Sequence, residues 1–210
     1  VYVYNRQILA VAEARAPRDP EYVFFGGGTP SLLSAEQWRV LADELDRITG
    51  FRASAKEVTA ECNPESLDLE KAEILLETGI RRLSIGFQSL HDDVLELFGR
   101  VHSAEDSFRA FEAARAAGVR ALNVDLIYAA PGQTVEQWEK DLARVLDLGP
   151  DHVSAYNLTF EEETRFQKWL ASGRVKKAPE ELELALFETT RRLVSERGLL
   201  PYEISNYAPT

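Results

Sequence analysis

Short apolar runs alternate with amphipathic runs along this chain, and this alternation constrains its fold more than any other feature. Six runs are rich in β-branched or aromatic residues and have the composition of β-strands. They lie at Val1–Tyr4, Tyr22–Phe25, Glu57–Cys62, Arg82–Phe87, Ala121–Ile127 and His152–Leu158. Between them apolar residues recur at helical spacing, as with Trp38, Leu41 and Leu45. The pattern predicts an α/β fold whose parallel strands are joined by right-handed helical crossovers.

The expected helices carry recognisable start and stop signals. Two pairs fit the capping box, in which a hydroxyl and an amide satisfy the first backbone N–H groups of a helix. These pairs are Ser34 with Gln37 and Thr134 with Gln137. Gly79 and Gly118 stand where helices should end, just before the following strands.

Three successive strands carry polar residues toward their carboxyl ends, on one face of the expected sheet. The polar residues are Glu61, Gln88 and Asp125, and each has apolar neighbours on the opposite face. A doubly wound sheet would be apolar on both faces, and a filled barrel would be lined with aliphatic residues. The pattern favours a partial six-stranded parallel (β/α)6 barrel whose interior holds a ligand with hydroxyl or ammonium groups. A structural network with neighbouring arginines is the alternative.

A glycine run follows the strand Tyr22–Phe25, within the sequence FFGGGTP of residues 24–30. Three consecutive glycines weaken a strand and let another molecule approach the backbone closely. This run therefore predicts a small-molecule site formed by main-chain groups, and a flexible turn is the alternative interpretation.

Composition narrows the classes of function. The 210 residues carry 24 basic and 35 acidic side chains, and the net charge of -11 argues against nucleic-acid binding. No run of about 18 apolar residues is present, so we expect no membrane span. The single cysteine, Cys62, excludes an intrachain disulfide and is typical of a reducing cytoplasm.

Arginine and histidine side chains add one candidate site residue. Arg100 lies in a loop before an expected helix, where it could hold a carboxylate with two hydrogen bonds or form a surface ion pair. His91, His102 and His152 lack metal-ligand spacing, so we interpret them as capping, surface or packing residues.

Seven motifs now form a recognisable series. They are FFGGGTPSLL (24–33), ECNP (61–64), RLSIGFQS (82–89), GRVH (99–102), NVDLIY with PGQT (123–134), HVSAY (152–156) and YEISNY (202–207). In this order they resemble the radical S-adenosylmethionine (SAM) proteins of the HemN/HemW group. That group comprises oxygen-independent coproporphyrinogen III oxidase-like proteins and haem chaperones. The serine after GGGTP and the YEISN sequence look more like the HemW-type haem chaperone branch.

The resemblance implies a partial barrel that binds SAM against a [4Fe-4S] cluster. By motif match, the methionyl part of SAM would contact Gly27, Gly28 and Thr29. Its polar groups would be held by Glu61, Gln88, Arg100 and Asp125. We expect the barrel to occupy residues 1–175 and an incomplete C-terminal extension to begin within residues 176–210.

The chain departs from the family at the cluster. The family holds its cluster with a Cys-x3-Cys-x2-Cys loop after the first strand, and this chain has no such loop. Cys62 cannot replace it, because a cluster needs several thiolates. The apparent strand Val1–Tyr4 runs into a helical pattern without a cap, so we expect that the cluster loop is missing near residues 3–5.

Three functional hypotheses remain open at this stage. The first is a haem chaperone that binds SAM and a cluster and delivers haem to acceptor proteins. The second is an oxidoreductase that decarboxylates the propionates of coproporphyrinogen III with radical chemistry supplied by its cofactor. The third is a phosphate- or sugar-binding β/α protein that uses the glycine loop.

Overall fold

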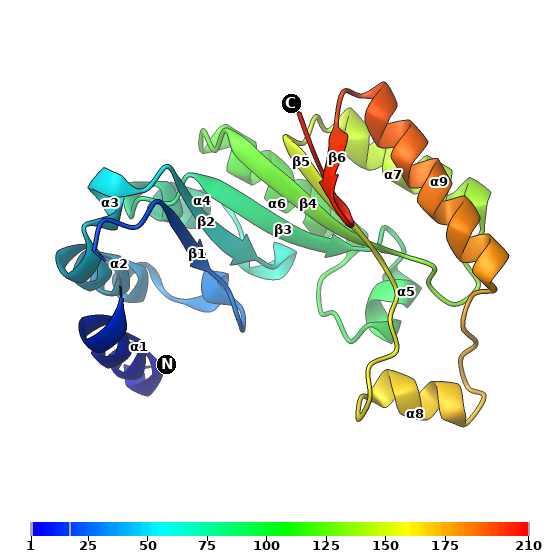
Figure 1. Cartoon of the computed structure of the whole chain (residues 1–210), viewed down its shortest axis with the longest axis horizontal. Coiled ribbons are helices and arrows are strands. Elements are labelled where there is room, and N and C mark those ends of the chain that lie inside the picture. Colours follow the sequence, from blue (N-terminus) through cyan, green and yellow to red (C-terminus); the bar gives the residue numbers. More distant parts are fainter. Residues whose placement is uncertain (1, 17, 210) are drawn as a thin grey trace. The chain divides into compact units, whose positions relative to one another are not determined.

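The computed structural model describes residues 2–16 and 18–209, which form alternating helices and strands (Figure 1). In chain order the elements are α1 (Tyr2–Arg15), β1 (Tyr22–Phe25), η1 (Pro30–Leu32), α2 (Ala35–Thr49), α3 (Phe51–Ser54), β2 (Glu57–Cys62), η2 (Pro64–Ser66), α4 (Leu69–Glu77), β3 (Arg82–Gln88), α5 (Asp92–Leu97), α6 (Ala104–Ala116), β4 (Ala121–Tyr128), α7 (Val135–Asp147), β5 (His152–Asn157), α8 (Arg165–Ala171), α9 (Glu180–Glu196), β6 (Leu200–Glu203) and β7 (Asn206–Ala208). The α/β class expected from the alternation is confirmed.

The described residues fall into two compact units. The first unit lies within Val1–Gly86 and Glu105–Leu122, and the second within Phe87–Ala104 and Asn123–Thr210. The division reflects only how compactly the residues pack. It does not test the boundary predicted near residue 175, between the barrel and a C-terminal extension, and that boundary stays a prediction.

Five of the six predicted strands are present, and those paired within each unit run parallel, as the alternation of strands and helices predicts. In the first unit β1 pairs with β2, and β2 pairs with β3, all in parallel. In the second unit β4 and β5 are parallel, and the hairpin of β6 and β7 joins β5 in the antiparallel direction. This hairpin adds two antiparallel strands beside β5, whereas the first of the six strands predicted in parallel is not formed among the described residues.

The strand predicted at Val1–Tyr4 is wrong for its described part, because Tyr2–Arg15 form the helix α1; Val1 lies outside the described residues. An isolated four-residue strand needs a neighbour to satisfy its backbone. No glycine or proline separates this run from the residues of α1 that follow it, so helix propagation extends through it. The expected missing loop near residues 3–5 stays a prediction.

The core of the first unit forms where α2 covers the strands. Its capping box is present as predicted, with the Ser34 side chain and the Gln37 backbone in contact, and the helix ends at the left-handed Gly50. Trp38 is fully buried, and its ring packs edge-on against Phe25 of β1 at 5.2 Å between ring centres. Burying a large aromatic side chain stabilises the packing by roughly 2–3 kcal/mol.

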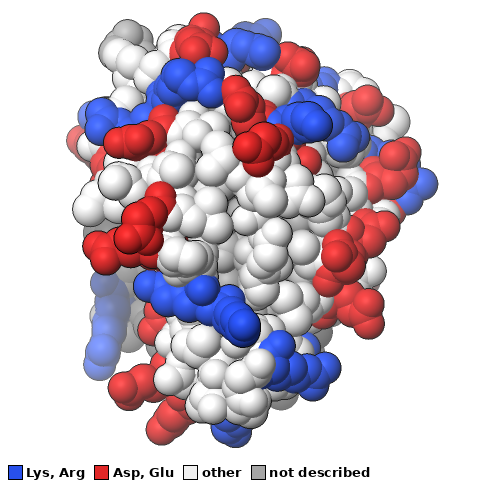
Figure 2. All heavy atoms as spheres, turned by 90° about the vertical axis from the view of Figure 1, so that its right-hand side faces the viewer, with Lys and Arg blue, Asp and Glu red and all other residues white. Residues whose placement is uncertain are grey.

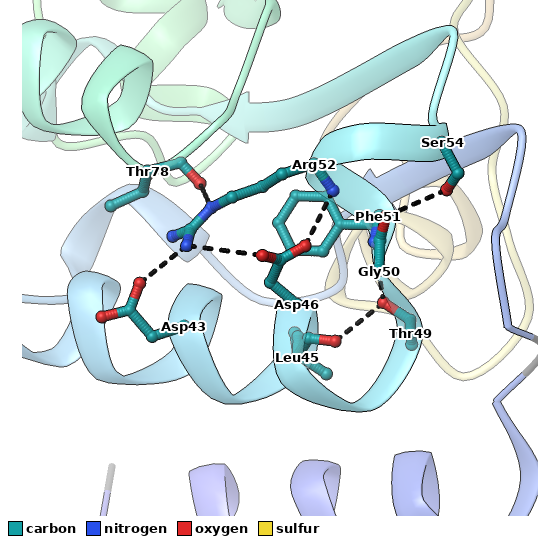
Figure 3. Close-up of polar contacts among 9 residues, drawn as sticks. All are labelled: Asp43, Leu45, Asp46, Thr49, Gly50, Phe51, Arg52, Ser54 and Thr78. Carbon is teal, nitrogen blue, oxygen red and sulfur yellow. Dashed lines mark hydrogen bonds and ion pairs between the residues drawn. The ribbon is translucent and has the colours of Figure 1, made fainter.

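Arg52 connects three segments of the first unit (Figure 3). Its Nε donates to the carbonyl of Thr78 at 3.0 Å, and its Nη1 donates to Asp43 at 2.8 Å. Asp46 accepts the Arg52 backbone N–H at 2.9 Å and lies 3.8 Å from the same Nη1. The guanidinium therefore fastens α3 to α2 and to the end of α4.

The second unit is organised by α7 and α9, which lie side by side in Figure 1 and contact each other. The predicted capping box of Thr134 and Gln137 starts α7. Trp138 of α7 is buried, and its Nε1 donates to Thr190 of α9 at 2.8 Å. This buried hydrogen bond sets the register of the two helices without leaving the indole N–H unsatisfied.

Candidate functional site

The glycine loop after β1 exposes its backbone. A Cβ on Gly26 would lie 2.4 Å from the Phe24 ring and 3.0 Å from Glu61 Oε2, so a larger residue at that position would displace one of these side chains. Gly27 has φ 109°, a conformation that L side chains rarely adopt. Among the described residues, no heavy atom lies within 4 Å of a Cβ placed on Gly27 or Gly28. The main chain of these two glycines is thus open to a ligand.

Glu61 of β2 meets this loop directly. The backbone N–H of Gly27 donates to Glu61 Oε2 at 3.2 Å, across 34 residues of sequence. Parallel pairing explains the contact, because Phe25 is in register with Ala60 and the next residues on each strand approach at the carboxyl edge. The structure therefore brings together two of the predicted site residues of the first unit.

Thr29 is held on the same side by a residue that the sequence analysis did not select. Asn63 Nδ2 donates to Thr29 Oγ1 at 3.1 Å and to Glu65 at 3.1 Å. The Asn63 backbone N–H also donates to Ser31 Oγ at 3.3 Å. These bonds tie the glycine loop to the end of β2. Asn63 directly follows the predicted strand Glu57–Cys62. Its position at the carboxyl end of this strand could have identified it as a candidate.

The second unit contains Gln88, Arg100 and Asp125, the other predicted site residues. Gln88 ends β3 with φ 64°, a left-handed conformation that costs a non-glycine residue about 1 kcal/mol. Arg100 Nε is buried and has no hydrogen-bond partner among the described residues. A buried donor without an acceptor costs about 1–3 kcal/mol, and an acceptor supplied by a ligand would remove that cost.

Asp125 belongs to a chain of polar side chains. Asn123 Nδ2 donates to Asp125 Oδ1 at 2.7 Å, and Asn123 Oδ1 lies 2.5 Å from His152 Nδ1. Ser154 Oγ donates to the same Asn123 oxygen at 3.2 Å, and His152 Nε2 lies 2.8 Å from the Tyr202 hydroxyl. The chain joins β4, β5 and β6 within the second unit.

The amide orientation of Asn123 defines the direction of this polar chain. Its NH₂ group faces the Asp125 carboxylate, so its oxygen faces His152 and requires a proton on Nδ1. His152 Nε2 then accepts from the Tyr202 hydroxyl. Period-two alternation on β4 places Asn123 on the face of Asp125, and this signal could have identified it. No local signal in the sequence identifies Tyr202.

Cys62 is not equipped for metal binding or nucleophilic chemistry. Its side chain is buried, and burial raises the pKa of the thiol to about 12, while a hydrogen bond with Ser31 acts in the opposite direction. Among residues 2–16 and 18–209, no group of three or more His, Cys, Asp or Glu side chains could hold a metal ion. In the same residues, no helix combines the length and apolarity needed to cross a membrane.

Comparison with known families identifies the class of this fold and site. The family model of the Radical SAM superfamily matches residues 2–145, and the chain belongs to this superfamily. The chain is 38% identical over 204 residues to the haem chaperone HemW of Bacillus subtilis, covering 97% of this chain and 54% of that protein. It is 37% identical over 187 residues to HemW of Haemophilus influenzae, covering 89% and 47% of the two chains.

Structural comparison agrees with the family. The solved structure of the coproporphyrinogen III oxidase HemN from Escherichia coli, described as a radical SAM enzyme, superposes with a TM-score of 0.81 and 25% identity. The superposition covers 98% of this chain and 49% of that one. The expected partial (β/α) barrel of the radical SAM type is thereby confirmed. The chain spans about half the length of these relatives.

Membership of the superfamily implies SAM and a [4Fe-4S] cluster as cofactors. The residues of each unit fit SAM in their chemistry. In the first unit, open glycine backbone and the Glu61 carboxylate match hydroxyl and ammonium groups, and in the second, the Asp125 carboxylate and the buried Arg100 Nε–H match hydroxyl and carboxylate groups. They do not fit the cluster, because the chain has one cysteine and its thiol is buried and protonated.

Proposed function

We propose that this chain is the radical SAM part of a haem chaperone, which binds SAM and haem and delivers haem to an acceptor protein. The observation that carries the proposal is the 38% identity to HemW of Bacillus subtilis across 97% of this chain. The proposal puts the protein in the cytoplasm, since one buried cysteine matches a reducing compartment.

The chain's own residues would bind and orient SAM. Gly27, Gly28 and Thr29 would contact its methionyl part, mainly through the backbone. Arg100 would pair with its carboxylate, because the buried Nε lacks an acceptor. In the family, SAM supplies radical chemistry when it is bound against a cluster. The single thiol of this chain is buried and cannot hold such a cluster.

Carboxylates would hold the remaining polar groups of SAM. Glu61 is already fixed by the Gly27 N–H, and Asp125 by the Asn123 amide. A carboxylate that is held by one donor loses little side-chain freedom when it accepts another from a ligand. Gln88, held in a left-handed conformation at the end of β3, would add an amide to this set.

Calorimetric titration of SAM tests these roles. Glu61→Ala and Asp125→Ala should each weaken SAM binding about 10- to 100-fold, the loss of one charged hydrogen bond. Glu70→Ala, which changes an exposed acid on α4, is the matched control and should bind like the parent. A circular dichroism spectrum that collapses in either site variant would instead show a structural role for that carboxylate.

The superposition on HemN supports coproporphyrinogen III oxidase as a second candidate. The two candidates differ in turnover. We would reconstitute a form of the protein that carries the expected cluster loop anaerobically with iron, sulfide, SAM and a reductant, and supply coproporphyrinogen III. Porphyrin formation would overturn the chaperone proposal, and stoichiometric haem binding without turnover would support it.

A further inference from the structure

Four aromatic rings form a cluster at α8 in the second unit, two of them on the helix itself and two on neighbouring loops. The Phe166 ring centre lies 5.7 Å from Phe98, 5.9 Å from Phe160 and 5.6 Å from Trp169. All four side chains are half-buried, and α8 has no buried residue among those described. The rings thus form a continuous apolar surface that the described part of the chain covers only in part.

Two arginines stand on this surface without an anionic partner. The guanidinium carbons of Arg165 and Arg174 lie 4.2 and 4.4 Å from the centre of the Trp169 ring. Neither side chain forms a hydrogen bond or an ion pair with any residue in the described part of the chain. We name these four rings and two arginines the Trp169 platform.

The charge around the platform opposes that of the whole chain. Residues 160–177, which include three of the four rings, contain five basic and three acidic side chains, a net charge of +2 (5 - 3), whereas the net charge of the chain is -11. Of these, Lys177 pairs with Glu183 at 3.4 Å. In the lower part of Figure 2, both basic and acidic side chains lie beside an uncharged surface. An excess of carboxylates elsewhere in the chain has not neutralised this segment.

This arrangement has a physical cost in the protein alone. Two guanidinium groups next to one ring repel each other, and stacking on the indole removes part of their water. A bound ligand with two carboxylates would convert the repulsion into charge-assisted, two-pronged hydrogen bonds. The surrounding phenylalanine rings would in turn bury a flat apolar body.

We propose that the Trp169 platform binds a carboxylate-bearing tetrapyrrole, with the macrocycle on the aromatic rings and its propionates on Arg165 and Arg174. Haem and coproporphyrin share this chemistry. The inference rests on the proposed function, since it names a site for the haem that the chaperone carries. Phe98 belongs to the same loop as Arg100, two residues away, so the platform begins beside a predicted SAM residue.

A titration of the 210-residue chain with metal-free protoporphyrin IX tests the site without a contribution from iron ligands. Fluorescence anisotropy would report binding to the parent and to the double variant Arg165→Ala/Arg174→Ala. We expect the double variant to bind at least 10-fold more weakly. Arg191→Ala is the matched control, because Arg191 also lies over a ring, that of Phe187 at 5.8 Å, and it should stay within twofold of the parent.

Further arms separate the possible failures. If the parent binds neither hemin nor protoporphyrin, both the proposed function and this inference are overturned. If the parent binds and the double variant binds equally, the inference fails and the proposed function stands. Coproporphyrin III, with four carboxylates, should bind at least as tightly as protoporphyrin. Loss of binding to anionic vesicles or to a polyglutamate peptide, with porphyrin binding unchanged, would assign the platform to those partners and overturn the inference.

Discussion

Arginine side chains have opposite surroundings in the two units: Arg52 in the first unit has several acceptors, and Arg165 and Arg174 in the second have none among the described residues. Arg52 is saturated with acceptors, since its guanidinium binds one backbone carbonyl and two carboxylates (Figure 3). Arg165 and Arg174 rest on one indole ring and have no acceptor among the described residues. An arginine whose N–H groups face several acceptors, such as Arg52, stabilises the contact between helices. Two arginines that lie on one ring without acceptors, such as Arg165 and Arg174, are arranged to bind an anion.

The largest expected effect is on the saturated arginine. Arg52→Ala should lower the free energy of unfolding by about 2 kcal/mol, because it leaves the Thr78 carbonyl and the Asp43 carboxylate without their donor and removes the ion pair with Asp46. Urea denaturation followed by circular dichroism measures this. Arg39→Ala is the control, since the Arg39–Glu77 pair is exposed and should contribute at most about 0.5 kcal/mol. If both variants lost the same free energy of unfolding, Arg52 would contribute no more than an exposed ion pair, and the comparison would be wrong.

A conservative change at the same position sharpens the comparison. Arg52→Lys should cost about 1 kcal/mol, because an ammonium group keeps the charge near Asp43 but cannot also reach the Thr78 carbonyl through a planar fork. The same denaturation measurement applies. A loss as large as that of Arg52→Ala would mean that the hydrogen bond to the carbonyl, and not the charge, dominates this junction.

Changes in the two arginines of the Trp169 platform should have little effect on the free energy of unfolding. Arg165→Ala/Arg174→Ala should change the free energy of unfolding by less than about 1 kcal/mol, since exposed cation–π contacts contribute little and mutual repulsion is removed. Thermal unfolding by calorimetry measures the change. A loss comparable to that of Arg52→Ala would show that these arginines hold α8 in place, as Arg52 holds its junction.

The smallest expected effect is at the buried thiol of the first unit. With a pKa of about 12 for Cys62, only about one thiol in 10,000 is ionised at pH 8. Iodoacetamide should therefore leave the folded chain unmodified, as mass spectrometry would show, and should alkylate it fully in urea. Rapid labelling of the native chain would contradict both the burial and the raised pKa.

Much of the fold follows from local patterns. The capping boxes at Ser34 and Thr134 lie within one turn of the helices that they start, so their residues determine the outcome by themselves. Period-two alternation selected Glu61 and Asp125 as candidate site residues, and their role stays a prediction. The prediction failed at Tyr2–Tyr4, where strand composition competed with an uninterrupted helix.

The candidate site could be predicted only in part. The sequence predicted Gly27 and Glu61 as site residues, which stays a prediction, and the structure shows that one hydrogen bond joins them. It did not identify Asn123, His152 and Tyr202 as one network, because the contacts between them span 29 and 50 residues. Such contacts depend on strand register, which no short window of sequence contains.

By itself the sequence determined the α/β class, the starts of α2 and α7, the glycine loop and the alternation of polar residues along the strands, because backbone sterics and short-range hydrogen bonds decide these within a few residues. Only the tertiary structure decided which polar groups have partners. It satisfied Arg52, left Arg100 Nε buried without an acceptor, and put Arg165 and Arg174 on Trp169. Burial and pairing depend on distant segments packed together, and that is where the predicted ligand sites acquire their chemistry.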